Sequence, residues 1–153
     1  MYRLVEEPTG LAYRGLLDFT RKHARQFTLV LVGSGKKSSA ARRVLEDLSL
    51  YFIERHEASE WPGTELMEGF TGTLHRYQVS DGSIEFLKSA APGLYAWHAP
   101  GLPDDLCFYR ADGTALLSSV AHERSGELYL APDEREELRR VVPVLDLSRV
   151  HEN

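Results

Sequence analysis

The order of hydrophobic and polar positions along the chain predicts a succession of helices and strands. Apolar residues recur at helical spacing from Thr9 to Ala24, and Thr9 is a suitable N-cap. The residues from 27 to 32 then form an almost unbroken apolar run, which is typical of a central strand covered on both faces. The start of the chain therefore predicts one helix followed by one buried strand.

The remaining pattern continues this succession to the end of the chain. Further helices are predicted from Ser38 or Ser39 to about Leu48, around 84–91, and from Pro132 to the residue before Pro143. Further strands are predicted over 51–57, 70–79, 106–110, 114–121 and 127–130. Asp112-Gly113 indicates a tight hairpin between two of these strands, because both positions must tolerate a positive φ.

This order of elements predicts an α/β fold that leans towards α+β. We expect a mixed sheet of about five to six strands flanked by helices, with an antiparallel C-terminal half because hairpins dominate there. Of the 153 residues, 1–143 are expected to form a single domain and 144–153 a C-terminal tail.

Composition and charge narrow the classes of function. The net charge of −5 gives no general attraction to nucleic acid, so no nucleic-acid partner is expected. The longest fully aliphatic run, 29–32, is far shorter than a membrane span, and no signal region opens the chain. The single cysteine, Cys107, suits a reducing compartment. We therefore expect a soluble cytoplasmic protein that needs no cofactor and has no membrane partner.

The segment Gly33–Ser38 lies between a predicted strand and a helix, where phosphate-binding loops occur. It departs from the P-loop pattern, because Val30 stands where a glycine is needed and Lys37 where a serine or threonine is needed. These two mismatches favour a solvated basic loop over a nucleotide-binding site.

Cys107 and His122 fall on the same predicted face of the hairpin, so a nucleophile and base pair is one hypothesis. Its apolar neighbours favour the alternative of a buried, inert cysteine.

Four polar residues gather at one end of the same hairpin: Asp104 and Asp105 enter one strand, and His122 and Glu123 leave the other. Such a cluster could hold a metal or act as acid and base. The simpler interpretation is that these residues form turns at the strand ends.

Three aromatic residues lie in predicted loops: Trp61 in a Pro-Gly turn, and Tyr95 and Trp97 in a second loop. They are either lids over the core or anchors for a partner, and a domain of this size favours lids.

The segments 1–4, 60–64, 102–108 and 118–123 together resemble small bacterial proteins that carry the label "stage III sporulation protein AH". The resemblance spans nearly the whole chain. It implies no catalytic residues, and no metal ligands are assigned.

Two functions remain open. The first is a non-enzymatic protein-binding module, such as a bacterial immunity protein or a small regulatory protein, with a protein partner that the acidic balance predicts to be basic. The alternative is a small enzyme or metal-binding protein that uses the acidic and histidine cluster. The residues expected to form a binding site are Trp61, Tyr95, Trp97, Asp104, Asp105, His122 and Glu123.

Overall fold

The structure is a computed structural model that describes residues 1–32 and 39–151. Within these ranges the helices are α1 (Gly10–His23), α2 (Ser39–Asp47), α3 (Asp81–Ala90) and α4 (Pro132–Val141). The strands are β1 (Tyr2–Leu4), β2 (Gln26–Val32), β3 (Phe52–Ala58), β4 (Glu60–Trp61), β5 (Thr64–Glu65), β6 (Gly72–Gln78), β7 (Asp104–Tyr109), β8 (Ala115–Val120), β9 (Ser125–Leu128) and β10 (Leu147–Arg149). Short 3-10 helices lie at η1 (Ser49–Tyr51), η2 (Leu94–Ala96) and η3 (Ala121–Glu123).

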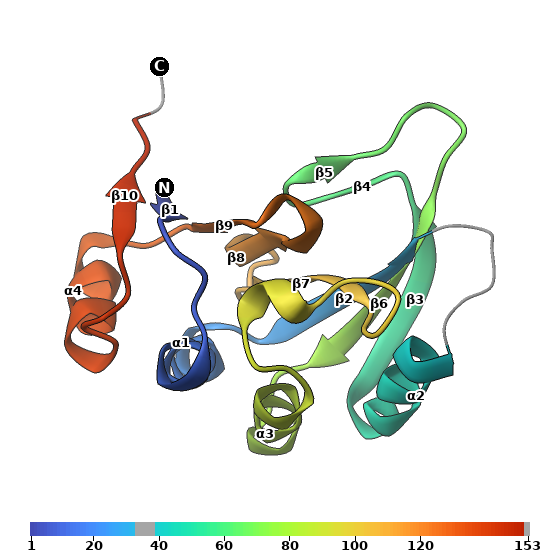
Figure 1. Cartoon of the computed structure of the whole chain (residues 1–153), viewed down its shortest axis with the longest axis horizontal. Helices are drawn as coiled ribbons and strands as arrows, with labels where there is room; N and C mark the ends of the chain where they lie inside the picture. Colours follow the sequence, from blue (N-terminus) through green and yellow to red (C-terminus); the bar gives the residue numbers. More distant parts are fainter. Residues whose placement is uncertain (33–38, 152–153) are drawn as a thin grey trace.

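One large sheet organises the molecule, with its strands in the order β10-β1-β9-β8-β7-β2-β6-β3 (Figure 1). The α/β class is confirmed, but the sheet has eight strands in the described chain and not five to six. Each pair of neighbouring strands in it is antiparallel, so the prediction of a mixed sheet is wrong.

The path of the chain from β2 through α2 to β3 explains this difference. A helix between two strands is the pattern of a parallel crossover. Here β2 and β3 run in the same direction, but β6 lies between them and pairs antiparallel with both. The crossover is therefore present, while the hydrogen-bonded neighbours remain antiparallel.

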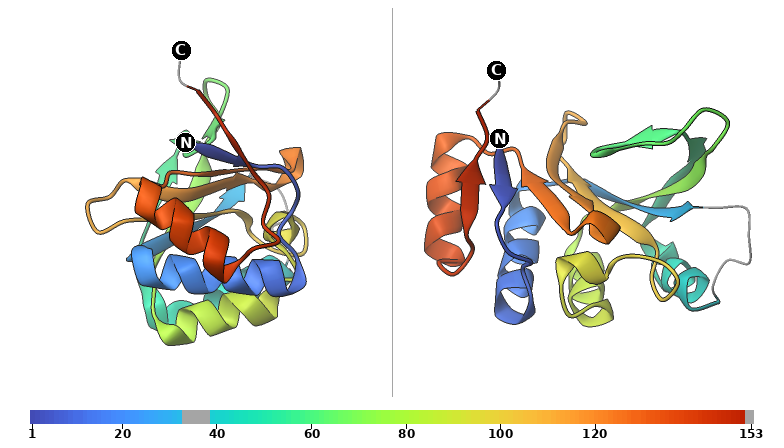
Figure 2. Two further views of the ribbon diagram at one scale, coloured as in Figure 1. Left: turned by 90° about the vertical axis from the view of Figure 1, so that its left-hand side faces the viewer. Right: turned by 45° about the horizontal axis from the view of Figure 1, so that its top comes forward.

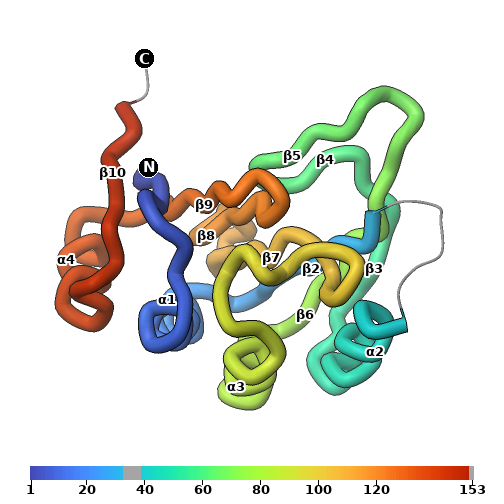
Figure 3. The backbone as a smooth tube through the Cα atoms, in the orientation of Figure 1, coloured from blue at the N-terminus to red at the C-terminus, as the bar shows by residue number. Residues whose placement is uncertain are grey.

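The two ends of the chain form strands that the sequence did not predict. β1 and β10 pair with each other at one end of the sheet, as the tube through the backbone also shows (Figure 3). Each has only three residues, too few for an alternating pattern to be recognised. Residues 147–149, within the segment expected to be a tail, thereby belong to the sheet.

The helices pack on one face of the sheet, and the main core lies between the two layers (Figures 1 and 2). Phe27 and Leu29 of β2 point into this core and are fully buried. Val30 points to the opposite face and packs there with Trp61 and Leu74. β2 is covered on both faces, as its apolar run predicts.

The β4–β5 hairpin covers part of the opposite face of the sheet (Figure 2). Its turn contains Gly63 with a φ of +87°, a conformation that favours glycine. A Cβ atom at this position would lie 2.8 Å from Cγ2 of Val120, so the turn rests directly on the end of β8. No helix in the described ranges is long and apolar enough to cross a membrane.

Candidate functional site

Asp105 lies at the start of β7 and joins three segments of the chain. Its side chain is buried, and its backbone adopts a φ of +58°. Oδ2 accepts a hydrogen bond of 2.9 Å from the indole Nε1 of Trp61, and Oδ1 accepts one of 3.1 Å from the backbone N–H of Ala121. Burial raises the pKa of this carboxyl. Both oxygens are thus occupied by donors of the protein itself.

Asp104 is half-buried beside it, and Oδ1 accepts a hydrogen bond of 3.1 Å from the backbone N–H of Ala99. Burial also raises the pKa of the Asp104 carboxyl. This contact closes the loop that leads into β7, which is the role of an acidic turn residue.

His122 and Glu123 lie in η3, directly after the residue that binds Asp105. Both side chains are 64% exposed, and Nε2 of His122 is 4.0 Å from Oε1 of Glu123. The structure therefore brings the four predicted residues to one end of the hairpin, but two are turned to solvent and Asp105 is engaged inside. Among the described residues, no group of three or more acidic, histidine or cysteine side chains is arranged to hold a metal ion.

The three predicted aromatic residues are buried, with exposed fractions of 7% for Trp61, 4% for Tyr95 and 0% for Trp97. Nε1 of Trp97 donates a hydrogen bond of 3.0 Å to the hydroxyl of Tyr13. The guanidinium of Arg124 lies 5.6 Å from the centre of the Tyr95 ring. Tyr95 and Trp97 belong to the main core, and Trp61 belongs to the smaller apolar cluster on the opposite face of the sheet.

Two further candidates from the sequence were Cys107 and the segment Gly33–Ser38. Cys107 is completely buried, and burial raises the pKa of its thiol to about 12, which suits an inert core residue. The segment Gly33–Ser38 lies outside the described residues.

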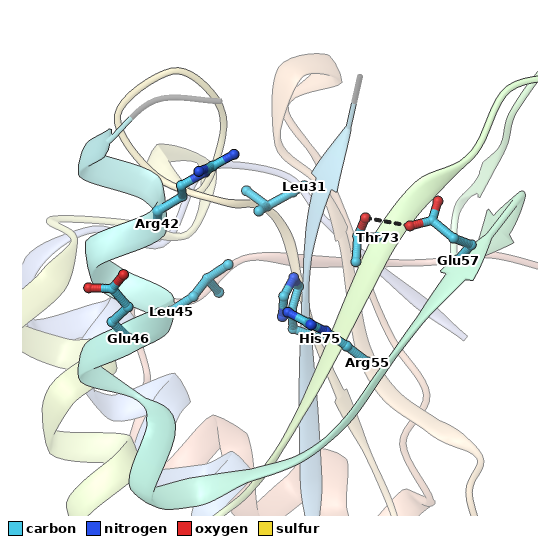
Figure 4. A pocket seen from close by; sticks show the side chains of 8 residues that line it. All are labelled: Leu31, Arg42, Leu45, Glu46, Arg55, Glu57, Thr73 and His75. Atoms are coloured by element: carbon cyan, nitrogen blue, oxygen red, sulfur yellow. Dashed lines mark hydrogen bonds between the residues drawn. The ribbon is translucent and has the colours of Figure 1, made fainter. Parts of the chain in front are cut away.

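A separate pocket lies between α2 and the strands β2, β6 and β3, with a volume of about 550 Å³. We call it the arginine pocket; it is lined by Leu31, Arg42, Leu45, Glu46, Arg55, Glu57, Thr73 and His75 (Figure 4). Arg42 and Leu45 extend from α2 towards the strands, and Arg55 and His75 extend from β3 and β6 towards the helix (Figure 4). The pairing of Arg55 with His75 across the two strands brings these side chains to the same face.

In the arginine pocket, the carboxylate of Glu57 has hydrogen-bond partners, whereas the two arginines have no carboxylate partner among the described residues. Glu57 accepts hydrogen bonds of 2.8 Å from the hydroxyls of Thr71 and Thr73. Within the described part of the chain, neither Arg42 nor Arg55 makes an ion pair with a carboxylate. The two guanidinium groups are therefore available to a ligand.

The pocket continues along β3 into a second, shallower one of about 390 Å³. We call this the apolar pocket; it is lined by Leu45, Glu46, Ser49, Phe52, Arg55, His75 and Tyr77. Four residues line both pockets, so together they form one groove beside β3. Three apolar side chains at or just before the start of β3 are exposed to solvent: Leu50 is 83% exposed, Phe52 46% and Ile53 37%.

Arg42, Arg55 and His75 were not among the binding residues predicted from the sequence. One signal was present in the strand 52–58, where four ionisable residues follow one another from Glu54 to Glu57. A strand with charges on both faces cannot be central, so it indicates an edge strand. The groove itself depends on how α2 packs against that edge, which no local pattern encodes.

The chain matches no protein-family model, no curated protein and no solved structure at significant similarity. The candidate site is therefore described from the geometry of this structure alone.

Proposed function

We propose that the protein is a binding module that holds an extended segment of a partner protein along β3. The observation that carries this proposal is the outer edge of β3. This strand is seven residues long, ends the sheet, and pairs only with β6 within the described residues. Extended segments add to such edges through backbone hydrogen bonds, while neighbouring pockets provide specificity for side chains.

Exposed apolar residues at the start of β3 support the same surface. Leu50, Phe52 and Ile53 lie within four residues of one another, and Phe52 also lines the apolar pocket. Apolar side chains clustered beside a pocket are typical of the centre of an interface, where most of the binding energy resides.

The charges of β3 restrict which segment can bind. Every side chain from Glu54 to Glu57 is exposed and ionisable, and such charges protect an edge strand from unselective pairing. A partner segment must then place charges of opposite sign against Glu54 and Arg55, and an apolar residue against Phe52. The net charge of −5 favours a partner that is basic as a whole.

The alternative is a small enzyme or metal-binding protein that uses Asp104, Asp105, His122 and Glu123. The internal hydrogen bonds of Asp105 and the exposure of His122 and Glu123 support this alternative less well. The groove offers a pocket, an uncovered strand edge and apolar anchors in one place, so it supports a binding function better.

Selection from a random peptide library displayed on phage tests the proposal. We expect enriched peptides to bind the protein, and a Leu50→Ser, Ile53→Thr variant to bind them at least about tenfold more weakly, because two exposed anchors are lost. Both replaced side chains are at least 37% exposed, so the fold is kept.

Leu11→Ser is the matched control, because Leu11 is 87% exposed and lies on α1, away from β3. Its affinity for the selected peptides should equal that of the unchanged protein. A library that yields no binding peptide, or peptides that bind the double variant equally well, would overturn the proposal.

A further inference from the structure

We infer that the arginine pocket is a binding site for a small anionic molecule, recognised through a phosphate or carboxylate group. The inference goes beyond the proposed function, because it concerns a small ligand and requires no protein partner. It rests on a cavity whose cationic groups converge from separate elements.

The two arginines approach the pocket from opposite walls. Arg42 extends from α2, and Arg55 extends from β3 on the other side (Figure 4). A guanidinium group presents several N–H donors in a plane and matches the oxygens of phosphate and carboxylate groups. Both groups line the same pocket, so an anion bound there is attracted by two cations.

The floor of the pocket is formed by side chains of β6. His75 lies there with only 8% of its surface exposed, and Thr73 lies two residues away on the same face of β6, where its hydroxyl donates to Glu57. An imidazole provides at least one N–H donor in either protonation state that it commonly adopts. The polar contacts therefore extend from the rim to the floor.

The acidic residues that line the pocket are not paired with the arginines. Glu57 is held by the hydroxyls of Thr71 and Thr73, and the carboxylate of Glu46 points to the opposite side of α2 in the close view (Figure 4). Among residues 1–32 and 39–151, Arg42 and Arg55 make no ion pair with a carboxylate. Both can therefore form an ion pair with an anion that enters the pocket.

The remaining lining favours a small organic ligand over a bare ion. Leu31 and Leu45 give the pocket two apolar walls, and its volume of about 550 Å³ lies within the range of small-molecule sites. Apolar walls also lower the local dielectric, so the attraction of the arginines for an anion becomes stronger than in open water.

Titration of the whole protein with inorganic phosphate and, separately, with succinate tests the inference. The readout is the NMR shift of the His75 ring protons at constant ionic strength, with sodium chloride as the reference salt. We expect saturable shifts with at least one probe. Saturation by phosphate alone identifies a phosphate site, and saturation by succinate alone identifies a carboxylate site; both support the inference.

Arg42→Gln and Arg55→Gln should each weaken binding about tenfold, because each removes one charge-assisted contact. Arg43→Gln is the matched control, since Arg43 is exposed on the same helix but does not line the pocket. Its dissociation constant should stay unchanged. The inference is overturned if neither probe gives a saturable shift, or if all three variants bind equally well. No peptide enters this experiment, so its result is separate from that of the library selection.

Discussion

The indole Nε1 of Trp61 donates a hydrogen bond of 2.9 Å to Oδ2 of Asp105. This bond fixes the β4–β5 hairpin to the start of β7, on the face of the sheet opposite helices α1 to α4. Because the other oxygen of Asp105 binds the backbone of Ala121, one buried carboxylate holds β4, β7 and η3 together. Trp61 and Asp105 are both among the residues predicted to form a binding site, and in the structure they bind each other.

Trp61→Phe should lower the free energy of unfolding by about 1–3 kcal/mol, because Oδ2 of the buried Asp105 loses its donor. Urea unfolding followed by circular dichroism measures the change. Tyr95→Phe is the control: it also removes a polar atom from a buried ring, but the Tyr95 hydroxyl makes no hydrogen bond within the described residues. That variant should be as stable as the unchanged protein or more so.

Asp105 should make the stability of the protein depend on pH. Burial raises the pKa of its carboxyl in the folded state, so the folded protein binds more protons than the unfolded chain just above the ordinary aspartate pKa. The contribution of Asp105 to stability is therefore greatest below that ordinary value, about 3.9, and falls as the pH rises through the folded pKa.

Asp105→Asn should reduce this decline in urea midpoints between about pH 4 and pH 7, and asparagine tolerates the positive φ at this position. Asp133→Asn, at an exposed position of α4, should leave the decline unchanged. Equal pH profiles for Asp105→Asn and the unchanged protein would contradict the account.

Gly63→Ala should destabilise the protein more than Gly69→Ala. Both glycines have nearly the same positive φ, +87° and +88°, so both replacements pay the same backbone cost. Only at Gly63 does the new Cβ meet another atom, Cγ2 of Val120 at 2.8 Å. The difference in unfolding free energy should be about 1–3 kcal/mol, and a difference near zero would mean that the hairpin does not rest on β8.

Glu134→Gln should weaken the attachment of α4. The Glu134 carboxylate accepts hydrogen bonds of 2.7 and 2.8 Å from the guanidinium of Arg110, and this contact lowers its pKa. We expect a loss of about 1–3 kcal/mol at neutral pH. The loss should shrink as the pH falls below the ordinary glutamate pKa of about 4.3, because the carboxylate contributes only while ionised. Glu136→Gln, on the exposed side of α4, should change thermal stability little at any of these pH values.

The parts of the fold with a strong local pattern could be predicted from the sequence. α1, the buried strand β2 and the hairpin of β7 and β8 are each present within a few residues of their expected bounds. The turn of the hairpin differs from the prediction, because Gly113 has a positive φ and Asp112 does not. β1 and β10 are too short for such a pattern, and the antiparallel order of the whole sheet depends on where β6 inserts. The position of β6 in the sheet is determined by packing between segments that are distant in the sequence.

The candidate site is less predictable for a related physical reason. The hairpin register correctly places Asp104, Asp105, His122 and Glu123 at one end, but it cannot tell which side chains turn inwards. Arg42 and Arg55 are 13 positions apart and line the same pocket only because α2 packs against the edge of the sheet. Their convergence is a property of the tertiary structure.

Hydrogen–deuterium exchange with a peptide taken from the library selection shows whether β3 receives an extended segment. We predict that the bound peptide slows exchange at backbone amides of residues 52–58, because amides on the outer edge of β3 become hydrogen-bonded. Slower exchange confined to another part of the protein, with residues 52–58 unchanged, would contradict the account.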